Sequence, residues 1–296
     1  MYAIKNAKKY KIYEKEPLQT QIYTIWHVTT FEGGGKDRIN YLKTIARENE
    51  KQNPNILYLI KEIQPEKLED ELSTSTPDMI SFGYGVGEIL LQHLEEIDET
   101  FLVRNDLVES AKFNNKIYAI PYILSGYAMI THNSQNTEFH VGTNDYVNPS
   151  IIYNELNLTP AQAETQYDAY RHFVYSKKAV LLGTARDVFR VSNLNSIGRT
   201  NAIISPVGSY TDLIQYFGLL KKDNVTTKFL KQVVQNENQK KLKDFSLFST
   251  TDVELYNDGI YKDMEIALKT ARKGNVFKKW KIWVYKKRKT KKFLHF

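Results

Sequence analysis

Side chains suited to binding a polar ligand lie together near the start of this chain. They are Trp26, His27, Phe31 and Glu32. Aromatic rings stack on the apolar C–H faces of sugar rings, and a carboxylate accepts hydrogen bonds from hydroxyl groups. The group therefore indicates a site for a polyhydroxylated ligand. A structural alternative stays open, in which Trp26 is a core residue and the neighbouring glycines only form a tight turn.

A strand, a turn and a helix are expected to position these residues. Residues 21–28 (QIYTIWHV) are apolar and aromatic, residues 29–35 (TTFEGGG) interrupt them, and residues 36–52 carry apolar side chains at helical spacing. In open α/β sheets, ligands bind at the carboxyl ends of the strands. The side chains are therefore predicted at that edge of a sheet.

The rest of the chain continues to alternate between strands and helices. Further strands are predicted at 56–63, 77–82, 116–124, 179–183 and 201–207, and helices at 65–72, 88–97, 163–174, 229–242 and 260–273. Asn114-Asn115 indicates a hairpin turn, Pro121 an edge strand or a crossing between lobes, and Gly274 a helix end. The pattern predicts an α/β fold with a mainly parallel sheet, and a length of 296 residues favours two lobes over one core.

The composition limits the possible functions. The chain has no cysteine, which excludes disulfides, zinc–thiolate sites and thiol nucleophiles. No apolar run approaches the roughly 20 residues needed to cross a bilayer. The net charge of +7 is due to residues 277–296, which hold nine of the 41 basic residues and no acidic one. The other 32 basic residues are matched by 34 acidic ones, so the body of the protein is close to neutral.

The motifs of common cofactor and catalytic sites are incomplete. The run GGGK lacks the first glycine and the Ser or Thr of a P-loop, because Thr30 and Asp37 occupy those places, and GYGVG lacks the third glycine of a dinucleotide fingerprint. The histidines, at positions 27, 93, 132, 140, 172 and 295, lack metal-binding spacing, and no G-x-S-x-G occurs. We therefore predict no metal, no cofactor and no catalytic residue; single acids such as Glu32 and Asp78 are more typical of hydrogen-bond partners.

The C-terminal segment interleaves aromatic and basic residues. Residues 277–296 contain Trp280, Trp283 and Tyr285 among many lysines. This pattern is typical of surfaces that bind nucleic acid, membranes or anionic wall polymers. The alternatives are a solvated, disordered tail and out-of-frame sequence after a genetic lesion, and we give these more weight. No nucleic-acid partner is expected.

Several segments resemble extracellular solute-binding proteins of family 1, the maltose-binding-protein-like sugar receptors of ABC importers. The segments occur in the order of that family and are 22–55, 77–87, 114–133, 177–191 and 210–242. The resemblance implies an α/β, two-lobed periplasmic-binding-protein type 2 fold with an interlobe cleft. It places residues 1–122 and 219–250 in lobe I, and residues 123–218 and 251–296 in lobe II.

The resemblance also implies a set of ligand-binding residues. They lie in loops that face the cleft and at the crossings between the lobes: Trp26, His27, Phe31, Glu32, Tyr84, Tyr122, Tyr127, Arg186 and Tyr210. In the matching segment of lobe II, residues 184–186, no tryptophan is present, so a tightly sandwiched oligosaccharide is not expected. Arg186 would instead donate bidentate hydrogen bonds to hydroxyls or to an acidic group.

The function implied by the resemblance is a non-enzymatic, monomeric receptor that presents a carbohydrate to ABC permease subunits. It would be extracellular and attached to the cell surface, although this sequence contains neither the signal peptide nor the lipid-bearing cysteine of the family. Membrane contact would be made only through such an anchor or the basic tail. Lobe II is short between residues 133 and 162. A receptor for an anionic solute such as a sugar phosphate, and a truncated or degenerate member, are the alternatives. A glycosidase is disfavoured because Glu32 has no convincing second carboxylate.

Overall fold

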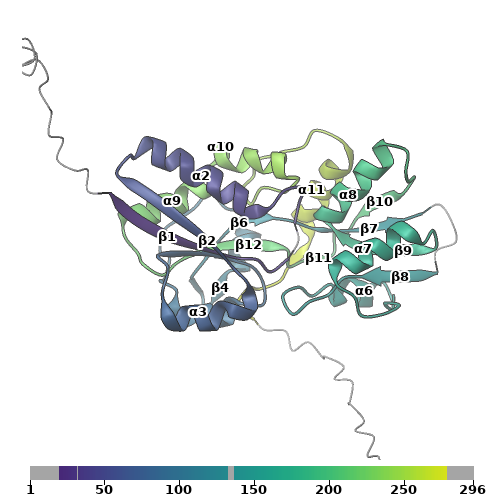
Figure 1. The fold of residues 1–296 in the computed structure, drawn as a ribbon, viewed down its shortest axis with the longest axis horizontal. Coiled ribbons are helices and arrows are strands. Elements are labelled where there is room, and N and C mark those ends of the chain that lie inside the picture. The colour runs from purple at the N-terminus through teal and green to yellow at the C-terminus, as the bar shows by residue number, and fades with distance from the viewer. Residues whose placement is uncertain (1–19, 32, 133–136, 279–296) are drawn as a thin grey trace, which may run out of the picture.

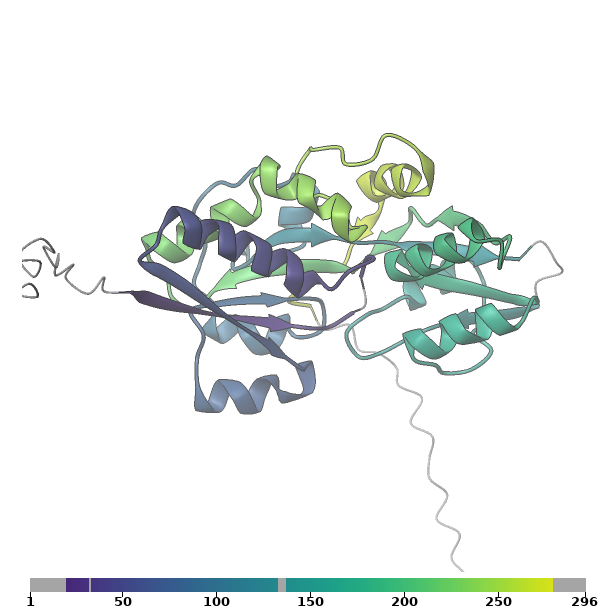
Figure 2. The same cartoon turned by 45° about the horizontal axis from the view of Figure 1, so that its top comes forward.

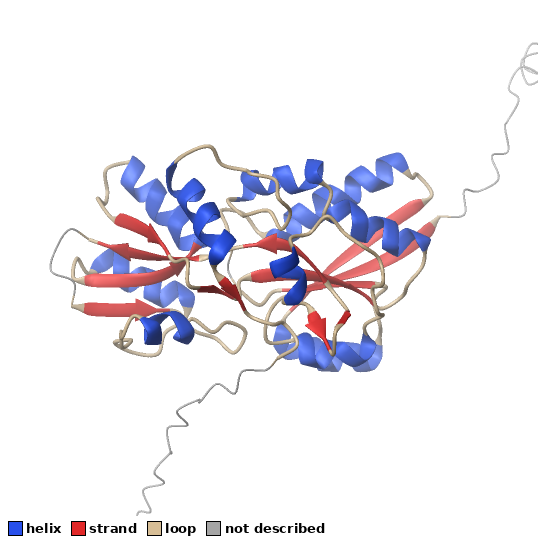
Figure 3. Ribbon diagram, turned by 180° about the vertical axis from the view of Figure 1, so that it is seen from behind, coloured by secondary structure: helices blue, strands red, loops and turns tan. Residues whose placement is uncertain are grey.

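The strand–turn–helix segment near the start of the chain builds the first of two α/β lobes. The computed structural model describes residues 20–31, 33–132 and 137–278. The two lobes lie side by side in Figure 1, with β1 in lobe I and β7 in lobe II. Seen from behind, each lobe is a sheet with helices packed against it (Figure 3). The predicted two-lobed α/β fold is therefore confirmed.

Lobe I contains a five-stranded mixed sheet in the order β2-β1-β3-β12-β6. Its strands are β1 (Gln21–Val28), β2 (Ile56–Ile63), β3 (Met79–Phe82), β6 (Ile120–Leu124) and β12 (Ile214–Leu219). β1 is parallel to β2 and β3, whereas β12 is antiparallel to β3 and β6. β12 therefore belongs to lobe I. The sequence-based boundary at residue 218 put most of this strand in lobe II, because its pairing partners are distant in the chain.

The helices of lobe I include several short segments, and one of them ends earlier than its periodicity predicts. They are α2 (Arg38–Gln52), η2 (Pro65–Lys67), α3 (Leu68–Thr74), α4 (Gly87–Leu90), η3 (Leu91–His93), α5 (Asn105–Glu109), α9 (Asn224–Val233), α10 (Asn236–Lys240) and η4 (Lys241–Phe245). The helix expected at 88–97 ends at His93. Beyond it, the N–H of Glu95 bonds to Leu219 (2.8 Å) and the N–H of Ile97 to Ile117 (2.8 Å). These tertiary bonds hold the chain extended in place of the last helical turn.

Local turn chemistry is read correctly from the sequence. Asn114 and Asn115 join β4 (Lys112–Phe113) to β5 (Lys116–Ile117), and both have positive φ, 49° and 63°. Asparagine tolerates this conformation, which a tight hairpin turn requires. Pro121 lies in β6, at the edge of the sheet, where its missing N–H does least harm.

Lobe II contains a four-stranded sheet in the order β10-β7-β9-β8. Its strands are β7 (Tyr127–Thr131), β8 (Glu138–Val141), β9 (Ala179–Thr184) and β10 (Ile203–Pro206), and its helices are α6 (Ser150–Glu155), α7 (Gln166–Tyr175), α8 (Ala185–Ser196) and α11 (Gly259–Thr270). The helix predicted to end at Gly274 already ends at Thr270, because β13 (Arg272–Lys273) pairs with β11 (Tyr210–Thr211). Of the helices in the described ranges, none is long and apolar enough to span a bilayer.

Within the described residues, the chain crosses between the lobes four times. Three of the crossings run from β6 to β7, from β10 to β12, and from η4 to α11. The fourth follows β13 and returns to lobe I, where the Val276 N–H donates to the Ser110 carbonyl (2.9 Å). Thr211 Oγ1 donates a hydrogen bond to the Ser125 carbonyl (2.9 Å), and Leu124 forms an antiparallel bridge with Phe248. The first three crossings are thus joined to one another by main-chain and side-chain bonds.

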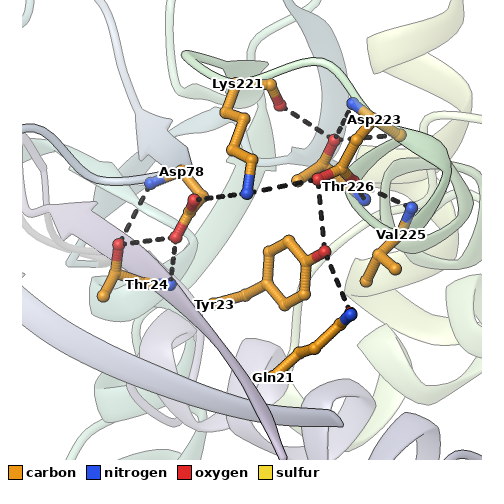
Figure 4. A network of polar contacts seen from close by, with 8 residues as sticks. All are labelled: Gln21, Tyr23, Thr24, Asp78, Lys221, Asp223, Val225 and Thr226. Atoms are coloured by element: carbon orange, nitrogen blue, oxygen red, sulfur yellow. Dashed lines mark hydrogen bonds and ion pairs between the residues drawn. The ribbon is translucent and has the colours of Figure 1, made fainter.

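A polar network fixes the end of the lobe I sheet that lies far from lobe II (Figure 4). The Asp78 carboxylate accepts hydrogen bonds from the N–H (2.7 Å) and hydroxyl (2.9 Å) of Thr24. The Lys221 ammonium lies between Asp78 (3.7 Å) and Asp223 (3.4 Å). Asp223 in turn caps α9 and accepts a bond from the Tyr23 hydroxyl (3.2 Å). Asp78 is therefore a hydrogen-bond partner that locks β1, β3 and the end of β12 in register.

Candidate functional site

A pocket of about 240 Å³ lies between the two lobes, at the carboxyl end of β1. It is lined by His27, Thr29, Phe31, Gly33, Asp37, Arg38, Ile39 and Glu62 from lobe I, and by Arg186 from lobe II. Figure 2 shows the loop before α2 approaching the start of α8 at this point. This candidate pocket lies at the sheet edge for which the sequence predicts a binding site, and ligand binding there stays a prediction.

The glycine-rich loop can take its path only with glycine at position 34. Gly34 has φ of +55°, and a Cβ there would lie 2.1 Å from the Phe245 carbonyl oxygen. The N–H of Gly35 donates to the same oxygen (2.7 Å). Positive φ and close backbone approach are both properties of glycine. The loop is thereby fastened to the end of η4.

Arg38 is the buried centre of the pocket wall. Its guanidinium donates to Gln215 Oε1 (2.6 Å) and to the Phe31 carbonyl, and it lies 3.7 Å from the centre of the Phe31 ring. Burial lowers the pKa of Arg38 to about 10, partly opposed by the nearby carboxylates. The side chain is still charged at neutral pH, and it holds the loop against β12.

A chain of polar side chains extends from Arg38 into lobe I. Gln215 Nε2 donates to Ser81 Oγ (2.8 Å), and Ser81 Oγ is also bonded to His27 Nδ1 (2.9 Å) and to the Tyr122 hydroxyl (2.7 Å). Burial lowers the pKa of His27 to about 3, with a further contribution from Arg38. His27 is therefore neutral at physiological pH. It contributes a polar side chain to the pocket lining but no positive charge.

Arg186 brings lobe II to the pocket. The capping box of Thr184 and Asp187 begins α8 at the end of β9, and Arg186 lies in the first turn of this helix. Arg186 Nη1 donates to the Gly34 carbonyl (3.2 Å), and Nη2 lies 3.6 Å from Asp37 Oδ1. Its side chain keeps about a quarter of its surface exposed. It can therefore reach a ligand while it bridges the lobes.

Two further contacts close the lobes over the pocket. Phe31 of the lobe I loop packs in the buried cluster of lobe II that includes Tyr127 and Leu182. Asn144 Nδ2 donates to the Thr30 carbonyl (3.3 Å). The pocket is thus seen with the lobes in contact.

The charges of the pocket balance. Arg38 and Arg186 supply two positive charges, and Asp37 and Glu62 supply two negative ones. Asp37 faces Arg186 and Glu62 accepts from the Thr29 hydroxyl (2.9 Å). A lining with no net charge and many hydrogen-bond donors and acceptors suits a ligand with hydroxyl groups better than a ligand with a net charge.

The structure brings some of the predicted binding residues together and separates others. His27, Phe31 and Arg186 line the pocket, while Glu32 lies outside the described residues. The remaining side chains are buried and do not line this pocket: Trp26, Tyr84, Tyr122, Tyr127 and Tyr210. Trp26 and His27 are neighbours on a strand, and successive side chains of a strand point to opposite faces.

Sequence reasoning missed Arg38, although a signal for it exists. Arg38, Tyr41, Leu42 and Ile45 occupy one face of α2 at spacings of three, four and seven residues, and all are buried. A charged residue at the first position of an apolar stripe is costly to bury unless it has partners. A basic residue at this position, directly after a glycine turn, therefore indicates a cation that binds a ligand or joins two segments of the fold.

A larger pocket of about 550 Å³ lies between α5, the segment at 249–253 and α11. Several of its charged side chains already pair with protein groups: Arg104 with Asp106 (2.7 Å) and Lys269 with Glu254 (2.7 Å). None of its lining residues belongs to the parallel strands β1, β2 and β3 or to the loop that follows β1. We therefore consider the smaller interlobe pocket the better candidate.

Asp212 connects the second crossing to lobe II. Its carboxylate is buried and accepts from the Tyr127 hydroxyl (2.8 Å) and from the N–H of Asn148. Burial raises the pKa of Asp212 from 3.8 to about 6, although the two donors oppose that effect. Between about pH 4 and pH 6, Asp212 therefore holds a proton in the folded protein that it releases in the unfolded chain.

Stability is expected to depend on pH through Asp212. Its contribution is most favourable below about pH 4, declines between about pH 4 and pH 6, and is constant above. Relative to Asp212→Asn, the unfolding free energy of the wild type should fall by about 3 kcal/mol over this range, since one pKa unit corresponds to about 1.4 kcal/mol. Urea denaturation of both proteins from about pH 4 to pH 7 measures this. A difference that does not change with pH would contradict the assignment.

Comparison with known proteins identifies the fold. The sequence matches no protein-family model and no curated protein. Among solved structures, the GacH receptor of Streptomyces glaucescens, determined unliganded and with acarbose, is similar with a TM-score of 0.63 and 13% identity, over 86% of this chain and 87% of the receptor. An ABC substrate-binding protein of Listeria monocytogenes in complex with cycloalternan is similar with a TM-score of 0.58 and 12% identity, over 87% of this chain and 89% of that protein. The maltotriose-binding protein of Thermus thermophilus, bound to maltotriose, is similar with a TM-score of 0.57 and 12% identity, over 85% of this chain and 88% of that protein. The chain therefore has the fold of two-lobed substrate-binding proteins.

Proposed function

We propose that this protein is a non-enzymatic receptor that binds a small carbohydrate in the interlobe pocket and presents it to an ABC permease. The observation that carries the proposal is a charge-balanced polar pocket to which both lobes contribute. Structurally similar proteins include receptors solved with oligosaccharides and related compounds. An extracellular location and attachment to the cell surface belong to the same proposal.

The pocket dimensions indicate the size of the ligand. Small-molecule sites are typically about 300–1,000 Å³, and the interlobe pocket has about 240 Å³. Of the described residues, only His27 and Phe31 contribute rings to its lining, and the Arg38 guanidinium covers one face of the Phe31 ring. A ligand of one or two sugar units, held mainly by hydrogen bonds, fits this arrangement. A longer oligosaccharide requires the lobes to separate.

Binding is expected to be coupled to lobe closure. Ligand contacts from both lobes form together only when the lobes approach, so a ligand stabilises the closed state by its differential affinity. The contacts of Arg186 with Gly34 and Asp37 are among those that join the lobes without a ligand. A permease that recognises the closed form would then distinguish loaded from empty receptor.

Calorimetry with monosaccharides, disaccharides and oligosaccharides tests the proposal. We expect heat and a raised melting temperature with a neutral mono- or disaccharide. A response to sugar phosphates alone would favour the anionic alternative, and no response to any sugar would contradict carbohydrate binding. Chromogenic glycosides are expected to show no turnover, and a turnover above that of the blank would contradict the non-enzymatic assignment.

Arg186→Ala is expected to weaken sugar binding by about ten- to a hundredfold. Hydrogen bonds from a charged group contribute about 1.5–3 kcal/mol, and this substitution removes the only lining side chain that lobe II provides in the described pocket. Arg199→Ala is the matched control, because Arg199 is an exposed arginine of the same lobe. Equal affinities for the two variants would exclude a binding role for Arg186.

A further inference from the structure

Three side chains of metal-ligand type meet in lobe II, outside the interlobe pocket. They are His140 on β8, Glu164 just before α7, and His172 on α7. One ligand atom from each lies within 4.8 Å of the other two. The Glu164 carboxylate is at the centre: His140 Nδ1 is 3.0 Å from Oε2, and His172 Nδ1 is 2.5 Å from Oε1. Ligand atoms around a tetrahedral zinc ion are about 3.3 Å apart, a separation that lies within the 4.8 Å limit for these three ligand atoms.

The fold brings His140 to Glu164, 24 residues further along the chain, and His172 follows Glu164 by eight residues. β8 is an edge strand of the lobe II sheet, and the N–H of Thr143 donates to the Glu164 carbonyl (3.0 Å) just beyond it. Gln162 Nε2 donates to Glu164 Oε1 (2.7 Å). The carboxylate is thereby held in place by a neighbouring amide, as ligating carboxylates commonly are.

The two ring nitrogens of the buried His140 differ in their hydrogen bonding: Nδ1 is bonded to Glu164. Among the residues that the structure describes, Nε2 has no hydrogen-bond partner. When Nδ1 donates a proton to Glu164, Nε2 is left as an unpaired acceptor in the interior, which is unfavourable. A metal ion on Nδ1 would place the proton on Nε2, which lies 3.9 Å from Glu138 Oε2. Outer carboxylates of this kind orient metal-bound histidines.

The cluster also has an open side. A pocket of about 410 Å³ adjoins it and is lined by polar groups, including Thr143, Thr165 and Asp168. The exposed half of His172 faces solvent here. Three protein ligands with solvent access to the fourth position are typical of zinc sites that retain a bound water.

We infer that His140, Glu164 and His172 bind a divalent transition-metal ion of the zinc class. Two imidazoles and one carboxylate favour such ions, whereas Mg²⁺ and Ca²⁺ prefer all-oxygen ligand sets. The ion would connect β8 to α7 and stabilise lobe II, because metal binding to the folded state adds to folding free energy. The sequence predicted no metal site, because His140 lies on a different element from Glu164 and His172 and the histidine spacing gives no local signal.

The test uses the full chain after treatment with EDTA and exhaustive dialysis. Isothermal titration with ZnCl₂ is expected to show one bound ion, and the melting temperature should rise with Zn²⁺ but not with Mg²⁺ or Ca²⁺. Co²⁺ should produce the visible d–d absorption of a tetrahedral site. His172→Gln is expected to weaken Zn²⁺ binding by at least roughly 10–100-fold, the loss that removal of even an outer-shell partner causes, and to abolish the Co²⁺ band.

His172→Gln keeps an amide donor near Glu164, and its half-exposed position makes a folded variant the expected outcome. His93→Gln in lobe I is the matched control, and Glu164→Gln is a second test of the same ligand set. Unchanged Zn²⁺ binding in His172→Gln, binding lost equally in His93→Gln, or a weak octahedral Co²⁺ spectrum would each overturn the inference.

Discussion

Replacing Trp26 with alanine is expected to lower the free energy of unfolding by about 3–5 kcal/mol and to leave the ligand affinity of the folded protein unchanged. The indole is 4% exposed and belongs to the main buried cluster. The Lys61 ammonium lies 5.5 Å from the centre of its ring, and Lys61 pairs with Glu71 of α3 (2.6 Å). Trp26 therefore faces α3, away from the pocket.

Urea denaturation and sugar calorimetry separate the two roles of Trp26. Ile22→Ala is the control, because Ile22 lies on the same face of β1 and is 56% exposed; a change below about 0.5 kcal/mol is expected there. A Trp26→Ala protein with near-normal stability and at least tenfold weaker binding would restore the stacking role that the sequence suggested.

Replacing Arg38 with methionine is expected to impair both stability and binding. The substitution leaves Gln215 Oε1 and the Phe31 carbonyl without their donor. Each buried acceptor left unsatisfied costs about 1–3 kcal/mol, so a total loss of about 2–6 kcal/mol is expected for the two. The loop that carries Phe31 is then no longer held against β12, and sugar affinity should fall along with stability.

Arg47→Met makes the same chemical change on the exposed face of α2 and serves as the control. Its unfolding free energy and affinity should match the wild type within about 0.5 kcal/mol. If Arg38→Met lost stability but bound sugar normally, Arg38 would be a structural cation only. If it lost neither, the hydrogen bonds of its guanidinium would contribute nothing measurable.

The sequence by itself determined the elements whose signals are local. The apolar segment of β1, the glycine turn and the stripe of α2 are encoded within short windows. Asn114-Asn115 specifies its hairpin because both residues tolerate positive φ, and Pro121 specifies an edge because it lacks an N–H. These preferences act within a few residues and do not depend on the rest of the fold.

Only the tertiary structure decided which of these residues meet at a site. Strand alternation requires Trp26 and His27 to face opposite ways, but the packing of α2 and the pairing of β12 determine that His27 is the one at the pocket. The same long-range pairing brings Gln215 to Arg38. In lobe II, the packing of α7 on β8 brings His172 to His140. Contacts between segments far apart in the chain leave no local periodicity, and therefore they appear only when the sheets have formed.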